Sequence, residues 1–152
     1  MGRLTQRINF FSIISKVNLK KIVSDIEKNI YLIFNDIECE RLIDNNISNA
    51  IKYATPNKPI SVTLSKSKDT NRVILEFKSF GKPIKDVTRI FEKNYRENEA
   101  KRGLGLGLNM VKGICEKYNC LYDTTYADEQ NIFTYTFIIP PAMQEVGDLI
   151  FS

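Results

Sequence analysis

The stretch Arg41-Leu-Ile-Asp-Asn-Asn-Ile-Ser-Asn-Ala-Ile-Lys-Tyr-Ala54 decides which fold this chain is predicted to adopt. In an α-helix, at about 100° per residue, its apolar residues fall on one face: Ile43, Ile47, Ala50, Ile51 and Ala54. Asn45, Asn49 and Lys52 fall on the opposite face. Asparagine is a poor helix former, and an ordinary surface helix more often carries Glu and Lys there. The pattern predicts an amphipathic helix from Asp36 to about Ala54.

The polar face of this predicted helix has the chemistry of a binding site. Side-chain amide oxygens, such as those of Asn45 and Asn49, can help to hold a hard cation such as Mg²⁺. A lysine one turn further on, Lys52, can meet a phosphate group. A polar helix face with no ligand remains the alternative at this point.

A second motif, Arg102-Gly-Leu-Gly-Leu-Gly-Leu-Asn109, precedes a helix predicted from about Leu106 to Tyr118. Alternate glycines allow a positive φ and let the backbone approach a ligand closely. The N-terminus of the following helix presents free N–H groups and a positive dipole end to an anion. The motif lacks the Gly-Lys-Ser/Thr ending of a Walker A loop and is not the Gly-x-Gly-x-x-Gly of dinucleotide-binding folds. A purely structural glycine turn is the alternative.

The rest of the chain predicts a mixture of helices and strands. Apolar spacing predicts a helix over Leu19 to Ile30 and a short strand over Tyr31 to Phe34, and Asn35-Asp36 offers a helix N-cap. Further strands are predicted at Ile60–Ser65, Val73–Ser79, Tyr122–Tyr126 and Ile132–Ile139, with a short helix or turn at Arg89–Tyr95. The predicted fold class is α/β (α+β), with helices packed on one face of a mixed sheet.

Composition excludes several classes of function. The chain has 152 residues, 43% hydrophobic and 26% charged, which fits one globular domain. It has no histidine, which excludes histidine-dependent nucleophiles, histidine metal ligands and phosphorylation of this chain on histidine. Its three cysteines form no Cys-x-x-Cys pair and are expected to be reduced thiols in the core or at the surface.

Charge and hydropathy bear on partners. The net charge is +4, and Lys and Arg are scattered among Asp and Glu without a dense basic block. This mildly favours anionic ligands and argues against nucleic acid. No apolar stretch approaches the ~20 residues of a membrane helix, so no direct membrane contact is expected.

Four motifs together resemble the catalytic, ATP-binding domain of bacterial sensor histidine kinases, which are Bergerat-fold ATPases. They are an N box at Asn45–Tyr53, a divergent first glycine box at Gly81 with Pro83 and Ile84, an F box at Ile90–Arg96, and a second glycine box at Gly103–Val111. The resemblance covers about Val17 to Pro140. It implies a two-layer sandwich with a mostly antiparallel sheet, and a catalytic domain over 17–141. Residues 1–16 would then be a remnant or linker, and 142–152 a C-terminal tail.

The resemblance also implies roles for single residues. Asn49 would coordinate a Mg²⁺ that bridges the ATP phosphates, Asn45 would support the phosphate side, and Lys52 would reach the phosphates. Phe91 would dock the lid or pack in the core. Arg96 would contact phosphate or the acceptor domain. The implied catalytic set is Asn45, Asn49, Lys52 and Arg96. The implied ATP-binding set is Asn45, Asn49, Lys52, Tyr53, Ser79, Gly81, Ile84, Phe91, Gly103, Leu104, Gly105, Leu106, Gly107 and Leu108.

Three positions separate this chain from relatives of the same fold. Hydrolytic members of the fold resemble one another in carrying a Glu as general base four residues before the metal-binding Asn. Here that position is Asn45, which cannot accept a proton at neutral pH. In the first glycine box, Ser79 stands where the family has an Asp that binds the adenine amino group, and Pro83 replaces the second glycine. Both changes should weaken ATP binding.

The implied activity is therefore that of a protein-histidine kinase domain. It would transfer the ATP γ-phosphoryl group to a histidine on separate dimerisation and phosphotransfer helices, which would pass it to a response regulator. Such a domain is expected to be cytoplasmic, with any membrane anchor located elsewhere in the parent kinase. The alternative is a degenerate, non-catalytic regulatory binding module, which Ser79 and Pro83 favour.

Overall fold

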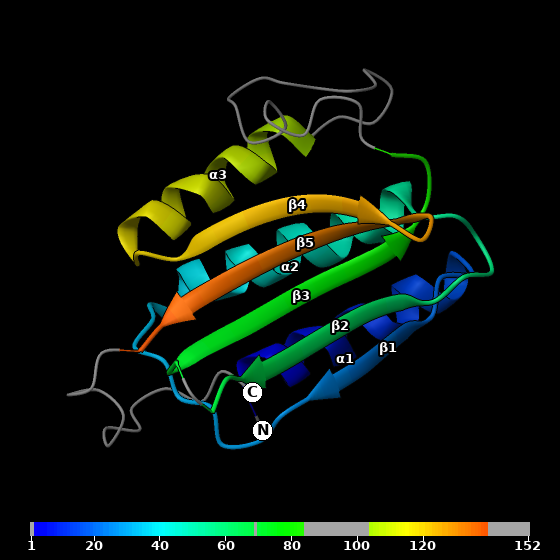
Figure 1. Ribbon diagram of the computed structural model, residues 1–152. Coiled ribbons are helices and arrows are strands. Elements are labelled where there is room, and N and C mark those ends of the chain that lie inside the picture. The colour runs from blue at the N-terminus through cyan, green and yellow to red at the C-terminus, as the bar shows by residue number, and fades with distance from the viewer. Residues whose placement is uncertain (1, 69, 84–103, 140–152) are drawn as a thin grey trace.

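The structure is a computed structural model that describes residues 2–68, 70–83 and 104–139. Figure 1 shows one layer of strands backed by one layer of helices. The elements in chain order are α1 (Arg3–Val17), β1 (Ile22–Ile26), α2 (Asp36–Tyr53), β2 (Ile60–Lys66), β3 (Arg72–Phe80), α3 (Leu104–Lys117), β4 (Leu121–Ala127) and β5 (Gln130–Ile138).

The strands form one mixed sheet in the order β1-β2-β3-β5-β4. β1 is parallel to β2, and the other three pairs are antiparallel. A parallel pair needs a crossover, and α2 supplies it between β1 and β2. All three helices lie on the same face of the sheet (Figure 1). The predicted two-layer architecture, mostly antiparallel with helices on one face, is confirmed.

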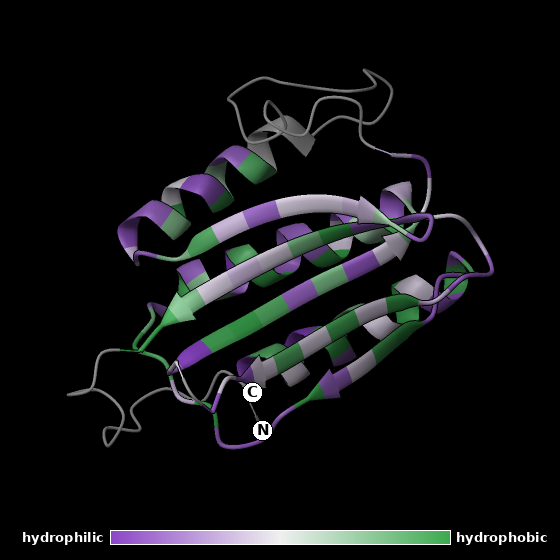
Figure 2. Cartoon of the chain, viewed as in Figure 1, coloured by the Kyte–Doolittle hydropathy of each residue, from purple (hydrophilic) through white to green (hydrophobic). Residues whose placement is uncertain are grey.

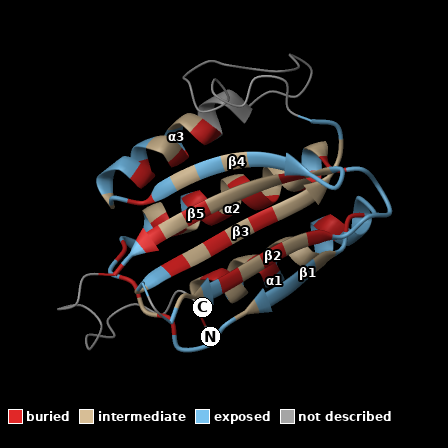
Figure 3. Cartoon of the chain, in the orientation of Figure 1, coloured by how far each residue is buried: buried red, intermediate tan, exposed pale blue. Residues whose placement is uncertain are grey.

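Alternation along the strands places the core between the two layers. In β2, Ile60, Val62 and Leu64 are buried, and the residues between them are polar (Figure 2). In β3, Val73, Leu75 and Phe77 are buried in the same way, as the colours in Figure 3 show. The strands predicted at Ile60–Ser65, Val73–Ser79, Tyr122–Tyr126 and Ile132–Ile139 are therefore confirmed to within two residues at each end. The predicted helix or turn at Arg89–Tyr95 lies outside the described residues.

The N-terminal region differs from its prediction. Residues 1–16 were expected to be a remnant or linker, but Arg3–Val17 form α1, whose Leu4 and Ile8 belong to the core. The helix predicted over Leu19–Ile30 is wrong, since Ile22–Ile26 form β1. Ile22 and Ile26 fit a helical spacing, but they also lie an even number of residues apart, and pairing with β2 decided the outcome. Helix α1 thus packs into the same core as the other elements.

Two further details concern the segment that leads into α2. Between 30 and 34 the chain forms only an isolated bridge at Tyr31 in place of the predicted strand, although Ile30, Leu32 and Phe34 are buried. The predicted N-cap is confirmed, because the Asn35 side chain accepts hydrogen bonds from the backbone N–H groups of Ile37 and Glu38. The predicted helix Asp36–Ala54 extends over Asp36–Tyr53.

A buried polar contact fixes how α2 sits on the sheet. The hydroxyl of Tyr135 in β5 donates to Oδ1 of Asn46 at 2.8 Å, and Nδ2 of Asn46 donates to the Leu42 carbonyl at 2.9 Å. Tyr135 is fully buried, and burial raises the pKa of its hydroxyl, so it stays a donor. Turning α2 about its axis would leave both buried groups unpaired, which costs more than an apolar mismatch.

The cysteines belong to the core rather than to the surface. Cys39, Cys115 and Cys120 are all buried and unbridged. Burial raises the pKa of Cys39 to about 12, so its reactive thiolate form is rare at neutral pH.

In the described ranges, no helix is both long enough and apolar enough to span a bilayer.

The contact between Tyr135 and Asn46 can be tested by a double-mutant cycle. Tyr135→Phe and Asn46→Leu should each lower the free energy of unfolding by about 1–3 kcal/mol, because each leaves one buried polar partner unsatisfied. The double variant should lose clearly less than the sum of the two, since both polar groups are then gone. Urea unfolding followed by circular dichroism measures all four proteins. Strictly additive losses would show that the two side chains do not interact.

Candidate functional site

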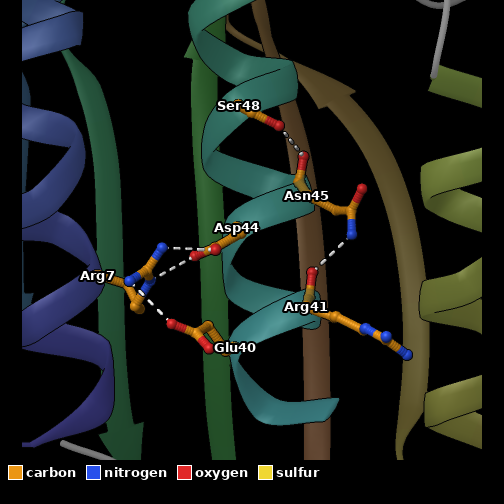
Figure 4. A network of polar contacts seen from close by, with 6 residues as sticks. All are labelled: Arg7, Glu40, Arg41, Asp44, Asn45 and Ser48. Atoms are coloured by element: carbon orange, nitrogen blue, oxygen red, sulfur yellow. Dashed lines mark hydrogen bonds and ion pairs between the residues drawn. The ribbon is translucent and has the colours of Figure 1, made fainter. Parts of the chain in front are cut away.

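Helix α2 carries most of the predicted site and has one neighbour on each flank. On one flank, Arg7 of α1 holds both carboxylate oxygens of Asp44 at 2.8 and 2.7 Å and lies 2.8 Å from Glu40 (Figure 4). The hydrogen bonds to Asp44 raise the pKa of Arg7 further. The side chain of Asn45 points away from α1 (Figure 4). The acidic residues Glu40 and Asp44 therefore bind α1, whereas Asn45 lies on a different side of α2.

On the other flank α3 runs antiparallel to α2. Near the end of α3, Lys117 donates to Oε1 of Glu38 at 2.7 Å, and the Tyr118 hydroxyl donates to the same oxygen at 2.9 Å. The hydrogen bond from Lys117 is the main cause that lowers the pKa of Glu38, and the bond from Tyr118 lowers it further. Because the end of α3 meets the beginning of α2, the beginning of α3 lies beside the second half of α2 (Figure 1). The helices that carry the N box and most of the second glycine box therefore pack side by side.

The first turn of α3 is built from the glycine run. α3 begins at Leu104, not at about Leu106, so Leu104, Gly105, Leu106 and Gly107 are helical. The first four N–H groups of a helix have no partner within it, and this end carries the positive dipole. Leu108 is buried and contributes to the core rather than to a ligand surface. Gly103, Ile84, Phe91 and Arg96 lie outside the described residues.

The asparagines of the N box differ in their surroundings. Nδ2 of Asn45 donates back to the Arg41 carbonyl at 2.7 Å. Nδ2 of Asn49 is buried and has no hydrogen-bond partner among the described residues. Buried polar atoms are nearly always paired, so an unpaired one needs a reason. A hydrogen bond from this amide to a bound ligand would supply that reason.

Two lysines lie at the C-terminal end of α2: Lys52 is exposed and Lys20 is buried. Lys52 is exposed, as a residue that meets a mobile phosphate would be. Lys20 is buried, and its ammonium donates to the carbonyl of Ile51 and lies 3.5 Å from that of Lys52. A positive charge suits the negative end of the helix dipole. Lys20 thus fixes the end of α2, a role that its sequence position did not indicate.

The first glycine box packs directly against the end of α2. A Cβ atom on Gly81 would lie 3.3 Å from the Tyr53 carbonyl oxygen, which leaves little room for a side chain. The backbone N–H of Thr55 donates to the Phe80 carbonyl at 2.8 Å. Tyr53, which is half-buried, and Gly81 therefore meet where α2 and β3 end.

Ser79 lies one strand position before this close approach. It is half-buried, and it has the same parity as Val73, Leu75 and Phe77, so it belongs to the face that the helices cover. Its Cα partner on the neighbouring strand β5 is Asn131. Ser79 thus occupies the inner face at the same end of the sheet as Gly81.

The sequence analysis missed two residues that hold this box. The Tyr126 hydroxyl donates to the Gly81 carbonyl at 3.0 Å, and Nδ2 of Asn131 donates to the Lys82 carbonyl at 2.9 Å. Both come from the β4–β5 hairpin. The sequence pattern could have indicated Asn131. It is the one amide among side chains that alternate onto the buried face of the strand, the others being Phe133, Tyr135 and Phe137.

A divalent cation has few possible protein ligands here. Among residues 2–68, 70–83 and 104–139, no three or more His, Cys, Asp or Glu side chains are grouped to hold a metal. The amide oxygen of Asn49 is the hard oxygen donor that the predicted site offers, and Mg²⁺ accepts few protein ligands when phosphates and water supply the rest. The donor set fits a metal bound together with a phosphate ligand.

Comparisons with known proteins identify a matching family. The family model described as histidine kinase-, DNA gyrase B-, and HSP90-like ATPase matches residues 35–143. The sensor protein kinase WalK of Staphylococcus aureus is 32% identical over 99 residues, which cover 61% of this chain and 24% of that protein. The same match covers 16% of the WalK sequence from Staphylococcus aureus strain JH9. The chain thus spans about a quarter or less of the curated relatives it matches.

Solved structures share the fold at low sequence identity. The catalytic domain of the histidine kinase ThkA has a TM-score of 0.78 at 16% identity and covers 90% of each chain. Full-length ShkA in complex with AMPPNP has a TM-score of 0.73 at 19% identity, covering 89% of this chain and 29% of that one. These likenesses concern the fold.

Asn49→Ala separates a binding role from a structural role. We expect it to weaken Mg²⁺-dependent ATP binding at least tenfold. The free energy of unfolding should stay unchanged or rise by up to about 1 kcal/mol, because Ala removes an unpaired buried donor and is the better helix former. Calorimetric titration and urea unfolding measure the two quantities.

The matched control is the neighbouring Asn46→Ala. It should lower stability by roughly 2 kcal/mol, because it leaves the Tyr135 hydroxyl unpaired. If Asn49→Ala unfolds the domain without a specific nucleotide defect, the face carrying Asn49 is structural.

Proposed function

Because the chain belongs to the family of histidine kinase-, DNA gyrase B- and HSP90-like ATPases, we propose that it is the catalytic domain of a sensor histidine kinase. In this proposal it transfers the γ-phosphoryl group of ATP to a histidine on a separate dimerisation and phosphotransfer domain. The observation that carries the proposal is the buried, unpaired amide nitrogen of Asn49 on α2, the helix that packs against α3. That arrangement suits an anionic ligand and a cation together.

The phosphate side of the proposed site uses groups of three kinds. The Asn49 amide offers a donor to a phosphate oxygen and an acceptor to Mg²⁺. The positive end of the helix dipole at the start of α3 and the ammonium of Lys52 offer positive charge. When bound, Mg²⁺ neutralises charge on the phosphates. The protein's part is then positioning and electrostatic stabilisation, which phosphoryl transfer mostly requires.

The residue at position 45 favours transfer over hydrolysis. The Asn45 amide is already bonded to the Arg41 carbonyl and has no proton to accept or release near pH 7. It therefore gives no general-base assistance to an attacking water. The chain has no histidine of its own, so the acceptor must be supplied by other helices. A response regulator would receive the phosphoryl group from that histidine. The unbridged cysteines support a cytoplasmic location.

A second candidate function is a regulatory module that binds nucleotide weakly and transfers nothing. The observation that favours it is the first glycine box, where Ser79 and Pro83 replace residues that would strengthen base binding. The two candidates differ in one measurable respect, because only the kinase domain labels an added histidine substrate.

The acceptor histidine can be tested with radiolabelled ATP. The chain alone should acquire no label, because it has no histidine. With dimerisation and phosphotransfer helices of its kinase family added, label should appear on those helices and be lost in acid. Acid-stable label on the chain itself would point to another acceptor and contradict the proposal. Tight ATP binding without any labelled helices would favour the regulatory module.

Ser79→Asp tests the base side of the site. A carboxylate accepts a hydrogen bond from the adenine amino group more strongly than a hydroxyl does, by about 1.4 kcal/mol, or roughly tenfold in affinity. We expect ATP to bind about tenfold more tightly, with a smaller gain for GTP, whose base presents a carbonyl there. Titration calorimetry with both nucleotides measures the difference. Equal or weaker ATP binding would mean that Ser79 does not contact the base.

A further inference from the structure

Strand β1 forms one edge of the sheet and presents a row of backbone groups there. The strand order β1-β2-β3-β5-β4 places it at an end, and among the described residues no strand lies beyond it (Figure 1). The Lys21 carbonyl and the Glu27 N–H both bond to β2. Because backbone groups alternate in direction along a strand, those of Ile22, Ser24 and Ile26 face outward. An edge of this kind is a template for another strand.

The side chains along this edge carry opposite charges at its two ends. Lys21 precedes the strand, Asp25 and Glu27 lie at its other end, and all three are exposed. No ion pair joins any of them to another described residue. Between them Val23 is 49% exposed, although it is apolar. A strand that is positive at its start and negative at its end is complementary to a second copy that runs the opposite way.

Antiparallel pairing centred on Ser24 matches two copies over the whole of β1. Its outward backbone groups then lie opposite outward groups of the second copy, which is the arrangement of hydrogen-bonded pairs. On one face of the joined sheet, Ile22 lies opposite Ile26 of the second copy. On the other face, Lys21 lies opposite Glu27 of the second copy, and symmetry makes each contact twice. A register centred on Val23 would leave Ile26 outside the paired strands.

We propose that two copies of this chain associate through antiparallel pairing of β1 about Ser24, which joins their two sheets into one. The two-fold axis passes between the two Ser24 residues, so the contact closes on itself and forms a dimer rather than a filament. The interface is small, so the dimer is weak, with a Kd on the order of 10–100 μM.

The inference goes beyond the proposed function and does not depend on it. Helix α3 contacts β4, which is the strand at the opposite edge of the sheet from β1. Pairing through β1 therefore leaves the candidate nucleotide site uncovered in both copies.

Charge reversal tests the contact between Lys21 and Glu27. Sedimentation velocity of the whole chain, at concentrations below and above ~100 μM, should show a reversible equilibrium of monomer and dimer. Lys21→Glu and Glu27→Lys should each weaken dimerisation by about fivefold or more, because each places like charges opposite one another twice. The double variant is the matched control. It restores opposite charges and should return the Kd to within about twofold of wild type.

Cysteine substitution tests the register. Cα atoms of a hydrogen-bonded antiparallel pair lie about 5.5 Å apart, which is within the range of a disulfide. Ser24→Cys should therefore form a disulfide between two chains when diamide is added as oxidant, as seen on a non-reducing gel. In the control Val23→Cys the new thiol lies opposite Asp25 of the second copy, so the two thiols are too far apart to bridge. The native cysteines are buried.

Three results would overturn the inference. A wild-type chain that stays monomeric well above ~100 μM would show that this edge does not associate with itself. A dimer that neither charge reversal weakens would use another face, such as the exposed apolar residues Phe10, Ile13 and Val17 of α1. A disulfide in Val23→Cys and none in Ser24→Cys would refute the register. ATP binding, measured on the same proteins, should be unchanged in every variant.

Discussion

A buried hydrogen bond between Tyr135 and Asn46 sets the orientation on which the rest of the structure depends. The interface between α2 and the sheet is otherwise built largely from Ile43, Ile47 and Ile51, whose contacts alone tolerate small rotations of a helix. A polar pair without access to water does not tolerate them, because a misaligned bond leaves two groups unsatisfied at once. With α2 fixed in this way, its acidic residues face α1 and its second half lies beside the start of α3.

The position of α1 follows from that orientation, but the ion pairs do not supply most of its stability. Arg7 holds Asp44 and Glu40, and Arg3 lies 3.2 Å from Asp36. Partly exposed pairs of this kind contribute up to about 1 kcal/mol each. Burying Leu4 and Ile8 contributes about 1.5–3 kcal/mol for each side chain. Apolar burial therefore holds α1 in the fold, and the charges determine its register on α2.

The candidate site is made of features that a purely structural domain would avoid. The polar face of α2 carries the poor helix formers Asn45 and Asn49, and the amide nitrogen of Asn49 is buried without a partner among the described residues. Glycines occupy the first turn of α3. Each costs stability relative to Ala, Glu or Lys at the same place. Proteins tolerate such costs mainly at functional sites. The β4–β5 hairpin provides the rigid support, because it holds the glycine box through Tyr126 and Asn131.

Sequence alone determined the elements whose signals are local. The N-cap at Asn35, the periodicity of α2 and the alternation of β2 and β3 each depend on neighbouring residues, so they could be predicted from the sequence. The glycine run and the motif resemblance could be read from it as well. The segment Leu19–Ile26 was ambiguous, because its apolar spacing fits a helix as well as a strand.

Tertiary structure decided the rest. Pairing of Ile22–Ile26 with β2 made that segment a strand, and burial of Leu4 and Ile8 made α1 part of the domain. The contacts of Asn46 with Tyr135 and of Asn131 with the glycine box join residues 89 and 49 positions apart. No local pattern specifies such partners, because strand register and helix packing bring them together only after the chain has folded.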